Sequence, residues 1–473
     1  MSTPRVRVLH VTPECAPMTK TGGLGDVSEA LPAALRAHGV DAMTLLPGYP
    51  AVLDGVGKKT PVSKLKLLGF ECLLLQADPF IVLDCPPLYR RDGGPYHTPE
   101  GRDWDDNALR FGVLSRGAAL LGGASSPLEW RPAVVHCHDW PSGLTPVYLR
   151  DEPEHAASVM TIHNLAFQGN HDAQLLGRLE LPPSAFTIDG VEFYGRLSFL
   201  KGGIATADAV TTVSPTYARE IQTADFGHGM DGLLRHRREV LSGILNGIDT
   251  AVWDPAGDAL IAQRYDADTL ESKAANKAAL QRRLGLEARA GVPIVGAVSR
   301  LTYQKGVDLL AAAADALVAL PAQLAVIGKG EGELERALAA AAARHPGQVA
   351  VRIAFDEPLA HAVEAGADLF VMPSRFEPCG LNQMYSQRYG TPPVARATGG
   401  LADTVQDGVS GFLFERPESE ALLEALRRAL AAYAEPPRWR KLQRAGMERD
   451  FSWSAAARRY ADLYLKLARL RQR

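Results

Sequence analysis

The chain has 473 residues, which is too long for one ordinary hydrophobic core and indicates two or three domains. Hydrophobic residues make up 46 % and charged residues 22 %, as is typical of a globular protein, and the net charge of -3 offers no electrostatic basis for binding nucleic acid or an anionic membrane. No apolar run approaches the roughly 18 residues that span a bilayer, so no membrane-spanning helix is predicted.

The number and spacing of the cysteines predict that the protein works in a reducing compartment. There are five of them, an odd count, and none forms a Cys-x-x-Cys pair. This pattern argues against a disulfide framework and against a zinc ribbon, so a cytoplasmic location is expected. The N-terminal stretch has no long apolar signal region and runs directly into a strand pattern. The five residues are Cys15, Cys72, Cys85, Cys137 and Cys379.

The first half of the chain predicts a parallel sheet. Residues 6–11 (VRVLHV) read as a buried strand, and a Gly-rich loop then leads into a helix over residues 27–39, which ends at a glycine. Later apolar runs are short and bounded by turn residues, with helical segments between several of them. Such alternation is typical of a parallel sheet with helices on both faces. The later runs are 43–47, 133–140, 157–164 and 209–215.

The same alternation restarts near Gly291 and predicts a second doubly wound α/β domain. We therefore expect an N-terminal domain over 1–245, a C-terminal domain over 246–455, and a last helix over 456–473 that crosses back to the first domain. The strands expected in the second half are 293–301, 323–328, 349–355 and 367–375, and the helices are 306–320, 333–347 and 421–436.

One short motif occurs twice. TGGLGD runs from Thr21 to Asp26, and TGGLAD runs from Thr398 to Asp403. A Gly-Gly loop lets backbone N–H groups approach an anion closely, and the N-terminus of the helix that follows favours negative charge. Ligands of open α/β sheets bind beyond the carboxyl ends of the strands. The repeat therefore predicts one anion-binding loop in each domain, the two facing a shared cleft.

Two cations and one carboxylate follow strands of the second domain. SRLTYQKG brings Arg300 and Lys305 into one loop, where both could hold a diphosphate whose negative charge grows as a bond to it breaks. Glu377 in SRFEPCGL comes just before a predicted helix and could accept hydrogen bonds from sugar hydroxyls.

Metal-binding patterns are weak. Asp103-Trp-Asp105 lies in a polar loop, and in Asp266-Ala-Asp268 the second aspartate and Glu271 resemble a capping box. His136 and His138 suggest a metal site by composition, but no third ligand is apparent. We predict no metal requirement.

Seven motifs, in order, resemble those of bacterial glycogen synthase and its relative, plant starch synthase. The resemblance covers nearly the whole chain. It implies the GT-B fold, in which two Rossmann-like domains face a cleft, and a retaining glycosyltransferase that moves glucose from ADP-glucose to the non-reducing 4-OH end of an α-1,4-glucan, with no cofactor. The motifs are KTGGLGDV, HCHDW, IHNLAFQG, NGID, SRLTYQKGVDL, PSRFEPCGLNQM and TGGLADTV.

The resemblance also implies roles for individual residues. One departure is Tyr385, which stands where many related transferases have a second glutamate that contacts ribose. Phe355 suits either stacking on adenine or the core. The implied catalytic residues are His163, Arg300, Lys305 and Glu377; the donor-binding residues are Lys20, Gly22, Gly23, Asn246, Phe355, Thr398, Gly399, Gly400 and Leu401; and the sugar and acceptor residues are Asp26, Tyr96, Asp139, Trp140 and Asn164.

Other functions remain open at this point. A transferase of the same fold could use UDP-glucose or form a disaccharide. A glucan phosphorylase would need a buried lysine that carries pyridoxal phosphate. A non-catalytic glucan-binding module would have no reason to keep Arg300, Lys305 and Glu377 together. The sequence makes no prediction of oligomeric state.

Overall fold

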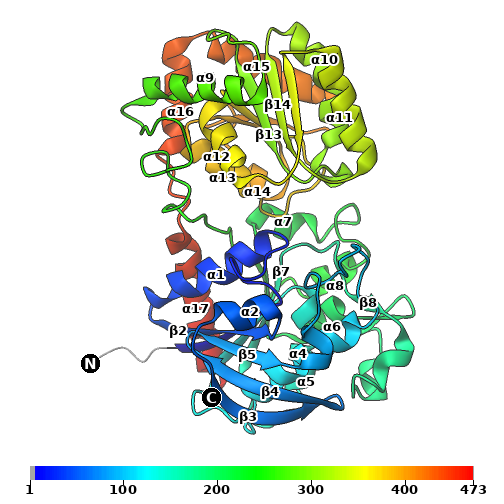
Figure 1. Ribbon diagram of the computed structural model, residues 1–473. Helices are drawn as coiled ribbons and strands as arrows, with labels where there is room; N and C mark the ends of the chain where they lie inside the picture. The colour runs from blue at the N-terminus through cyan, green and yellow to red at the C-terminus, as the bar shows by residue number, and fades with distance from the viewer. Residues whose placement is uncertain (1–5, 472–473) are drawn as a thin grey trace. The chain divides into compact units, whose positions relative to one another are not determined.

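The computed structural model describes residues 6–471, whose contacts form two compact units (Figure 1). The first unit comprises Met1–Asn246 together with Trp453–Arg473, and the second comprises Gly247–Ser452. Each unit is built around its own largely parallel sheet with helices on both faces. The predicted fold class, two doubly wound α/β units, is confirmed.

The first unit contains a nine-stranded sheet in the order β12-β11-β7-β6-β1-β2-β5-β4-β3. Strands from β12 to β5 run parallel, and β3, β4 and β5 pair antiparallel. The bounds are β1 Val6–Val11, β2 Val40–Pro47, β3 Thr60–Leu67, β4 Phe70–Ala77, β5 Phe80–Asp84, β6 Val134–His138, β7 Ala157–Ile162, β11 Ala209–Thr212 and β12 Leu241–Gly243.

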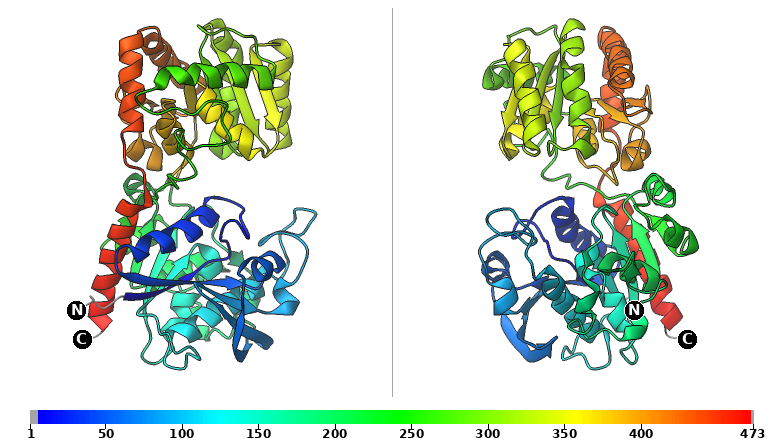
Figure 2. Two further views of the ribbon diagram at one scale, coloured as in Figure 1. Left: turned by 60° about the vertical axis from the view of Figure 1, so that its left-hand side comes forward. Right: turned by 90° about the vertical axis from the view of Figure 1, so that its right-hand side faces the viewer.

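Both faces of this sheet are buried. Val8 belongs to the apolar cluster under α1 and α17, whereas Leu9 belongs to the cluster under α4, because successive side chains of a strand point to opposite faces. Figure 1 and both views in Figure 2 show α17 alongside α1 within this unit. The helices are α1 Gly23–Arg36, α2 Pro50–Gly55, α3 Pro86–Tyr89, α4 Asn107–Gly122, α5 Thr145–Leu149, α6 Phe199–Thr206, α7 Pro215–Glu220, α8 Asp231–His236 and α17 Trp453–Arg471.

The antiparallel edge of the sheet was not predicted. Leu68 and Gly69, both with positive φ (49° and 83°), join β3 to β4 in a two-residue hairpin turn. A separate three-stranded sheet in the order β8-β10-β9 was also missed, because strands this short carry almost no periodic signal. Its strands are β8 Asn170–His171, β9 Glu192–Phe193 and β10 Arg196–Ser198, and the short 3-10 helices of this unit are η1 Trp140–Ser142, η2 Ala173–Leu176 and η3 Pro183–Ala185.

The second unit contains a six-stranded parallel sheet in the order β15-β14-β13-β16-β17-β18. Helices α10, α11 and α15 cover one face, and α9 and α12 cover the other. The strands are β13 Ile294–Val298, β14 Gln323–Gly328, β15 Val349–Ile353, β16 Leu369–Met372, β17 Pro393–Arg396 and β18 Phe412–Phe414. The helices are α9 Lys273–Leu284, α10 Val307–Ala319, α11 Gly332–Arg344, α12 Glu357–Gly366, α13 Asn382–Arg388, α14 Gly399–Thr404, α15 Ser419–Tyr433 and α16 Pro436–Met447, with 3-10 helices η4 Leu270–Ser272 and η5 Tyr303–Lys305.

Among the helices within residues 6–471, none is long and apolar enough to cross a membrane.

Candidate functional site

A buried ion pair lies beyond the strand ends of the second unit. Nζ of Lys305 donates to Oε2 of Glu377 at 2.6 Å, and the hydroxyl of Ser374 donates to the same oxygen at 3.0 Å. The side chains of Lys305 and Glu377 are only 18 % and 6 % exposed. Two of the residues predicted to be catalytic therefore hold each other, a contact that the sequence analysis did not foresee.

The loop after β13, which carries Lys305, is held against the loop after β16, which carries Glu377. Gly306, directly after Lys305, has φ 66°, and a Cβ there would lie 2.0 Å from the carbonyl oxygen of Pro373, so only glycine allows this approach. Arg375 then binds both carboxylate oxygens of Asp308 at 2.6 and 2.7 Å, and its guanidinium lies 3.5 Å from the ring centroid of Tyr303. These contacts hold the loop after β13 against the loop after β16.

Arg300 differs from Lys305 in having no such partner. Its side chain is exposed, and within the described residues it forms no ion pair or hydrogen bond. Lys305, in the same SRLTYQKG loop, forms an ion pair with Glu377, whereas Arg300 is exposed to solvent. An exposed guanidinium remains available to bind phosphate oxygens in a forked geometry.

The second TGGL loop packs against the segment that carries Glu377. The N–H of Gly400 donates to the carbonyl oxygen of Glu377 at 3.1 Å, and that of Leu401 donates to Thr398 at 3.0 Å. Both amides therefore have backbone partners in this structure, and their role in binding phosphate stays a prediction. A Cβ on Gly400 would lie 2.0 Å from the carbonyl oxygen of Cys379, so close packing already explains this glycine.

Two aromatic residues of the second unit take contrasting positions. Phe355 is 77 % exposed just beyond β15, so it is not a core residue, and its ring is free to stack on a ligand. Tyr385, which stands in place of the expected glutamate, stacks on Trp253 with ring centroids 3.9 Å apart. His361 stacks on the other face of Trp253 at 3.8 Å. The ring of Tyr385 therefore packs within the second unit.

In the first unit, the ends of β6 and β7 meet at Asp139. This residue has φ 56° and ψ -177°, a strained conformation for a residue other than glycine, and such strain costs about 1–3 kcal/mol. Its carboxylate accepts the backbone N–H of His163 at 2.7 Å. Burial raises the pKa of the Asp139 carboxyl to about 7, although its bonds to the amides of His163 and Asn164 oppose that rise. Strain and a shifted pKa together are typical of functional positions.

His163 is half-buried and neutral. Burial lowers its pKa to about 3. Nε2 of His163 lies 3.0 Å from Nδ1 of His138, so the predicted active-site histidine is hydrogen-bonded to a second histidine from β6. Next to it, Asn164 is also half-buried, and its Oδ1 accepts the N–H of Ala166.

In the sequence, His136 and His138 had no apparent third partner, but the structure supplies one. His10 on β1 completes a group of three buried histidines whose ligand atoms lie within 4.8 Å of one another. It was missed because β1 and β6 are far apart in the chain but adjacent in the sheet, which places His10 directly opposite His136.

An aromatic group surrounds Trp140. Its ring meets the edge of Phe111 at 4.8 Å and lies 6.2 Å from the ring of Tyr96. The hydroxyl of Tyr96 donates to Oε1 of Glu14 at 2.6 Å. Trp140 and Tyr96, both predicted sugar contacts, are therefore held in one cluster of the first unit.

Glu14 is a site residue that the sequence analysis missed. It is 3 % exposed, and its Oε2 accepts the backbone N–H groups of Thr21 at 2.6 Å and Gly22 at 3.3 Å. The first TGGL loop therefore already holds an anion, which is a carboxylate of the same chain. Its position after β1, at the carboxyl edge of the sheet, was a signal that could have been used.

The remaining predicted residues have simple surroundings. Nζ of Lys20 donates to Oδ1 of Asp26 at 2.7 Å, across the first TGGL loop. Asn246 is 7 % exposed, and its Oδ1 has no hydrogen-bond partner within residues 6–471. Gly23 opens α1.

The Asp-x-Asp patterns are engaged in local contacts. Asp103 pairs with His97 at 3.1 Å in an exposed loop. The predicted capping box of Asp268 and Glu271 is wrong, because the helices that follow begin after Thr269 and Ser272 and neither has a side-chain cap. Asp266 instead accepts the N–H groups of Asp268 and Thr269 in the turn before η4.

Two family models match the chain. Residues 7–236 match the starch synthase catalytic domain, and residues 283–445 match the glycosyl transferases of group 1. Among curated proteins, the chain is 51 % identical to a glycogen synthase of Nitrosospira multiformis, with 98 % of each chain covered. It is 53 % identical to a glycogen synthase of Aromatoleum aromaticum, covering 98 % of this chain and 97 % of that protein.

Solved structures show the same fold. The catalytic domain of starch synthase IV from Arabidopsis thaliana, bound to ADP and acarbose, matches with a TM-score of 0.86 and 31 % identity, covering 98 % of this chain and all of that chain (100 %). A sucrose-phosphate synthase from Thermosynechococcus elongatus matches with a TM-score of 0.61 and 21 % identity over 98 % of this chain and 100 % of that one, a similarity of fold alone. The predicted GT-B fold is confirmed.

Proposed function

Because this chain belongs to the glycogen synthase family, whose members are glycosyltransferases that add glucose from a nucleotide sugar to a glucan, we propose that its donor is ADP-glucose and its acceptor the non-reducing 4-OH end of an α-1,4-glucan such as glycogen. The anomeric configuration is retained and ADP is released. The observation that carries the proposal is the group formed by exposed Arg300 and the buried pair of Lys305 and Glu377.

The leaving group explains why cations are needed. As the bond between glucose and the diphosphate breaks, negative charge grows on the phosphate oxygens, and fixed positive groups stabilise it. Arg300 and Lys305 follow β13 in one loop and supply that charge. Glu377 has one oxygen held by Lys305 and Ser374, which orients its carboxylate to accept hydrogen bonds from the transferred glucose.

In the first unit, we assign the sugar and acceptor contacts to the group around Asp139. His163, Asn164, Trp140 and Tyr96 supply hydrogen-bonding and aromatic surfaces of the kind that bind sugars. Support also comes from the plant starch synthase at 31 % identity, whose structure contains ADP and acarbose.

Further donor contacts stay predictions, as does the location of the protein. Its five cysteines are all free and buried, which supports the cytoplasm. The donor contacts are Lys20, Gly22, Gly23, Asn246, Thr398, Gly399, Gly400 and Leu401, with Asp26 near the sugar.

Donor choice is tested by incubating the protein with glycogen and either ADP-glucose or UDP-glucose, and measuring the released nucleotide. We expect release of ADP with elongation of the glucan and little release of UDP. Preference for UDP-glucose, or glucose transfer to a small acceptor in place of glycogen, would favour the rival transferases. Binding of glycogen without release of either nucleotide would favour a non-catalytic glucan-binding module.

Phe355→Ala is expected to raise the KM for ADP-glucose about tenfold and to leave kcat nearly unchanged. The reason is that a ring stacked on a base contributes about 1–1.5 kcal/mol, and it does so equally in the ground state and the transition state. Steady-state kinetics measure both constants. Val409→Ala is a matched control, because this side chain is 50 % exposed and apolar in the same unit. An unchanged KM in the Phe355 variant would exclude stacking on the base.

Activity is expected to be unchanged in excess EDTA. Arg300 and Lys305 supply the positive charge that a metal would otherwise bring, and one aspartate of each Asp-x-Asp pattern, Asp103 and Asp266, has a local partner. The measurement is ADP release before and after chelation. Loss of activity that magnesium or manganese restores would contradict this prediction.

A further inference from the structure

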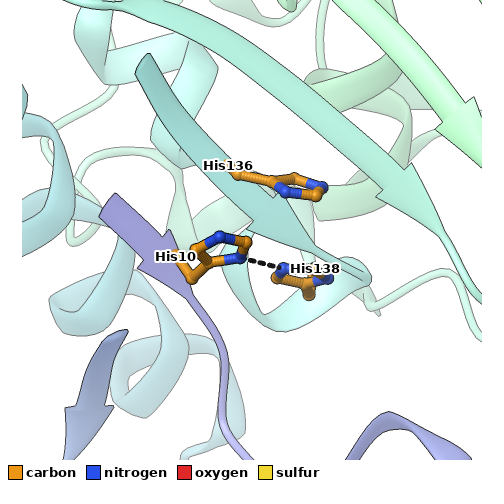
Figure 3. A group of neighbouring side chains, drawn as sticks. All are labelled: His10, His136 and His138. Atoms are coloured by element: carbon orange, nitrogen blue, oxygen red, sulfur yellow. Dashed lines mark hydrogen bonds between the residues drawn. The ribbon is translucent and has the colours of Figure 1, made fainter. Parts of the chain in front are cut away.

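Three imidazole rings form a hydrogen-bonded chain that runs inward from His163. Nε2 of His163 lies 3.0 Å from Nδ1 of His138, and Nε2 of His138 lies 3.1 Å from Nδ1 of His10. Figure 3 shows the inner bond, with His10 and His138 on neighbouring strands of the first unit. The chain therefore links a half-buried ring at the predicted sugar site to a fully enclosed one.

All three rings are neutral. His10 and His138 are 1 % and 0 % exposed, and burial lowers the pKa of His10 to about 3 and that of His138 well below its usual value. A neutral imidazole carries one hydrogen, so it donates through one nitrogen and accepts through the other.

Neutral rings allow only two arrangements of the hydrogens. In the first, His163 donates through Nε2 to His138, and His138 donates to His10. In the second, His10 donates through Nδ1 to His138, and His138 donates to Nε2 of His163. The middle ring cannot donate in both directions without a second proton, and its burial opposes that charge. The state of His10 therefore determines which nitrogen of His163 carries the hydrogen.

The inner end of the chain favours the second arrangement. Nε2 of His10 is buried and has no hydrogen-bond partner in the described part of the chain. The first arrangement, in which His163 donates, would leave an unpaired N–H at Nε2 of His10. The second, in which His10 donates, leaves only an unpaired acceptor at that atom. Buried N–H groups without a partner are rarer in proteins than acceptors without one.

We propose that His138 and His10 are positioning residues that hold His163 as its Nδ1–H tautomer, and that His163 thereby presents a fixed hydrogen-bond donor to the substrate. Nδ1 of His163 has no protein partner within residues 6–471, and the ring is half-buried, so this N–H is available to a ligand. The role of this donor at the sugar rests on the proposed function, but the tautomer does not.

His136 lies beside the chain but outside it. Its Nδ1 is hydrogen-bonded to the hydroxyl of Tyr464 at 2.6 Å and its Nε2 to the hydroxyl of Thr161 at 2.5 Å. Its ring is tilted by 35° against that of His138, with the centroids 4.1 Å apart. Hydrogen bonds therefore account for every nitrogen of the His10, His136 and His138 group except Nε2 of His10. No ion is needed to explain the group.

The tautomer is measured by long-range ¹H–¹⁵N correlation spectra of protein with ¹⁵N-labelled histidine. The signals of His163 are assigned by their loss in His163→Gln. We expect a protonated Nδ1 and a bare Nε2 for His163 in the wild-type protein without substrate. A protonated Nε2, or shifts showing that His10 and His138 bind a metal, would overturn the proposal. Because no substrate is present, this result stands whether or not ADP-glucose is the donor.

Two variants of His138 separate positioning from packing. His138→Phe keeps a flat ring against His136 but cannot donate, so the Nδ1–H form of His163 should no longer dominate, and kcat should fall about tenfold to a hundredfold with KM for ADP-glucose nearly unchanged. His138→Asn retains an N–H that can reach Nε2 of His163 and should restore kcat to within a few-fold of wild type.

Tyr464→Phe is the matched control, since it removes a hydroxyl from His136 in the same buried region but leaves the chain intact. The tautomer of His163 and kcat should stay as in wild type. An equal loss of kcat in His138→Phe and His138→Asn, or an unchanged tautomer of His163 in His138→Phe, would overturn the proposal. If a variant of His138 does not fold, the wild-type spectrum still decides the tautomer.

Discussion

Arg300→Ala is expected to lower kcat about a hundredfold to a thousandfold and to leave the melting temperature unchanged. The side chain is exposed and has no partner within residues 6–471, so its removal breaks no contact of the folded chain. What is lost is a positive group where negative charge develops on the leaving diphosphate, an effect worth roughly 3–4 kcal/mol. Rates of ADP release and a thermal melt measure the two quantities.

The control for this variant is Arg336→Ala. Arg336 is an exposed arginine on α11 of the same unit, so it matches the change in charge and in side-chain size. Its activity should be that of the wild-type protein. Near-normal turnover in Arg300→Ala would contradict the assignment of Arg300 to the diphosphate.

Lys305→Ala is expected to lose both activity and stability. The loss of kcat should again be about a hundredfold to a thousandfold, for the same electrostatic reason. Stability should fall by about 3 kcal/mol because Glu377, whose side chain is 6 % exposed, would remain as a buried carboxylate without its cation. Kinetics and thermal unfolding distinguish this double effect from the single effect expected at Arg300.

The double variant Lys305→Ala with Glu377→Gln tests the cause of that instability. A neutral amide needs no cation, and its oxygen can still accept the hydroxyl of Ser374, so the melting temperature should recover while activity stays low. Glu377→Gln alone should lower turnover but bind ADP with nearly wild-type affinity in calorimetry. No recovery of the melting temperature in the double variant would show that Lys305 stabilises the loop by other means.

The two TGGL loops show how far a local pattern can be interpreted. In both copies a helix begins within the motif itself, at Gly23 and at Gly399, so the first helix starts four residues earlier than the sequence predicted. The anion at the first loop, however, is the carboxylate of Glu14, and the second loop packs its Gly400 against the backbone of Cys379. A Gly-Gly turn indicates that another group lies close to the backbone, but only the packing of the unit shows which group that is.

The sequence by itself determined the elements and the family. Strands β1, β6, β7, β13 and β16 were predicted because each is an apolar run between turn residues, a property of neighbours along the chain. Ordered motifs also indicated which residue types follow those strands, and thus the class of reaction.

Tertiary structure decided which of those residues meet. Lys305 and Glu377 are 72 residues apart, and His10 and His138 are 128 apart, yet each pair is in hydrogen-bond contact. These meetings depend on strand order and register: β1 lies beside β6, and β13 lies beside β16. The alternation of side chains along a strand determines which face of the sheet each side chain lies on. It does not specify which strand lies alongside, because any buried strand offers the same apolar surface. The ion pair of Glu377 and the tautomer proposed for His163 follow from those neighbours.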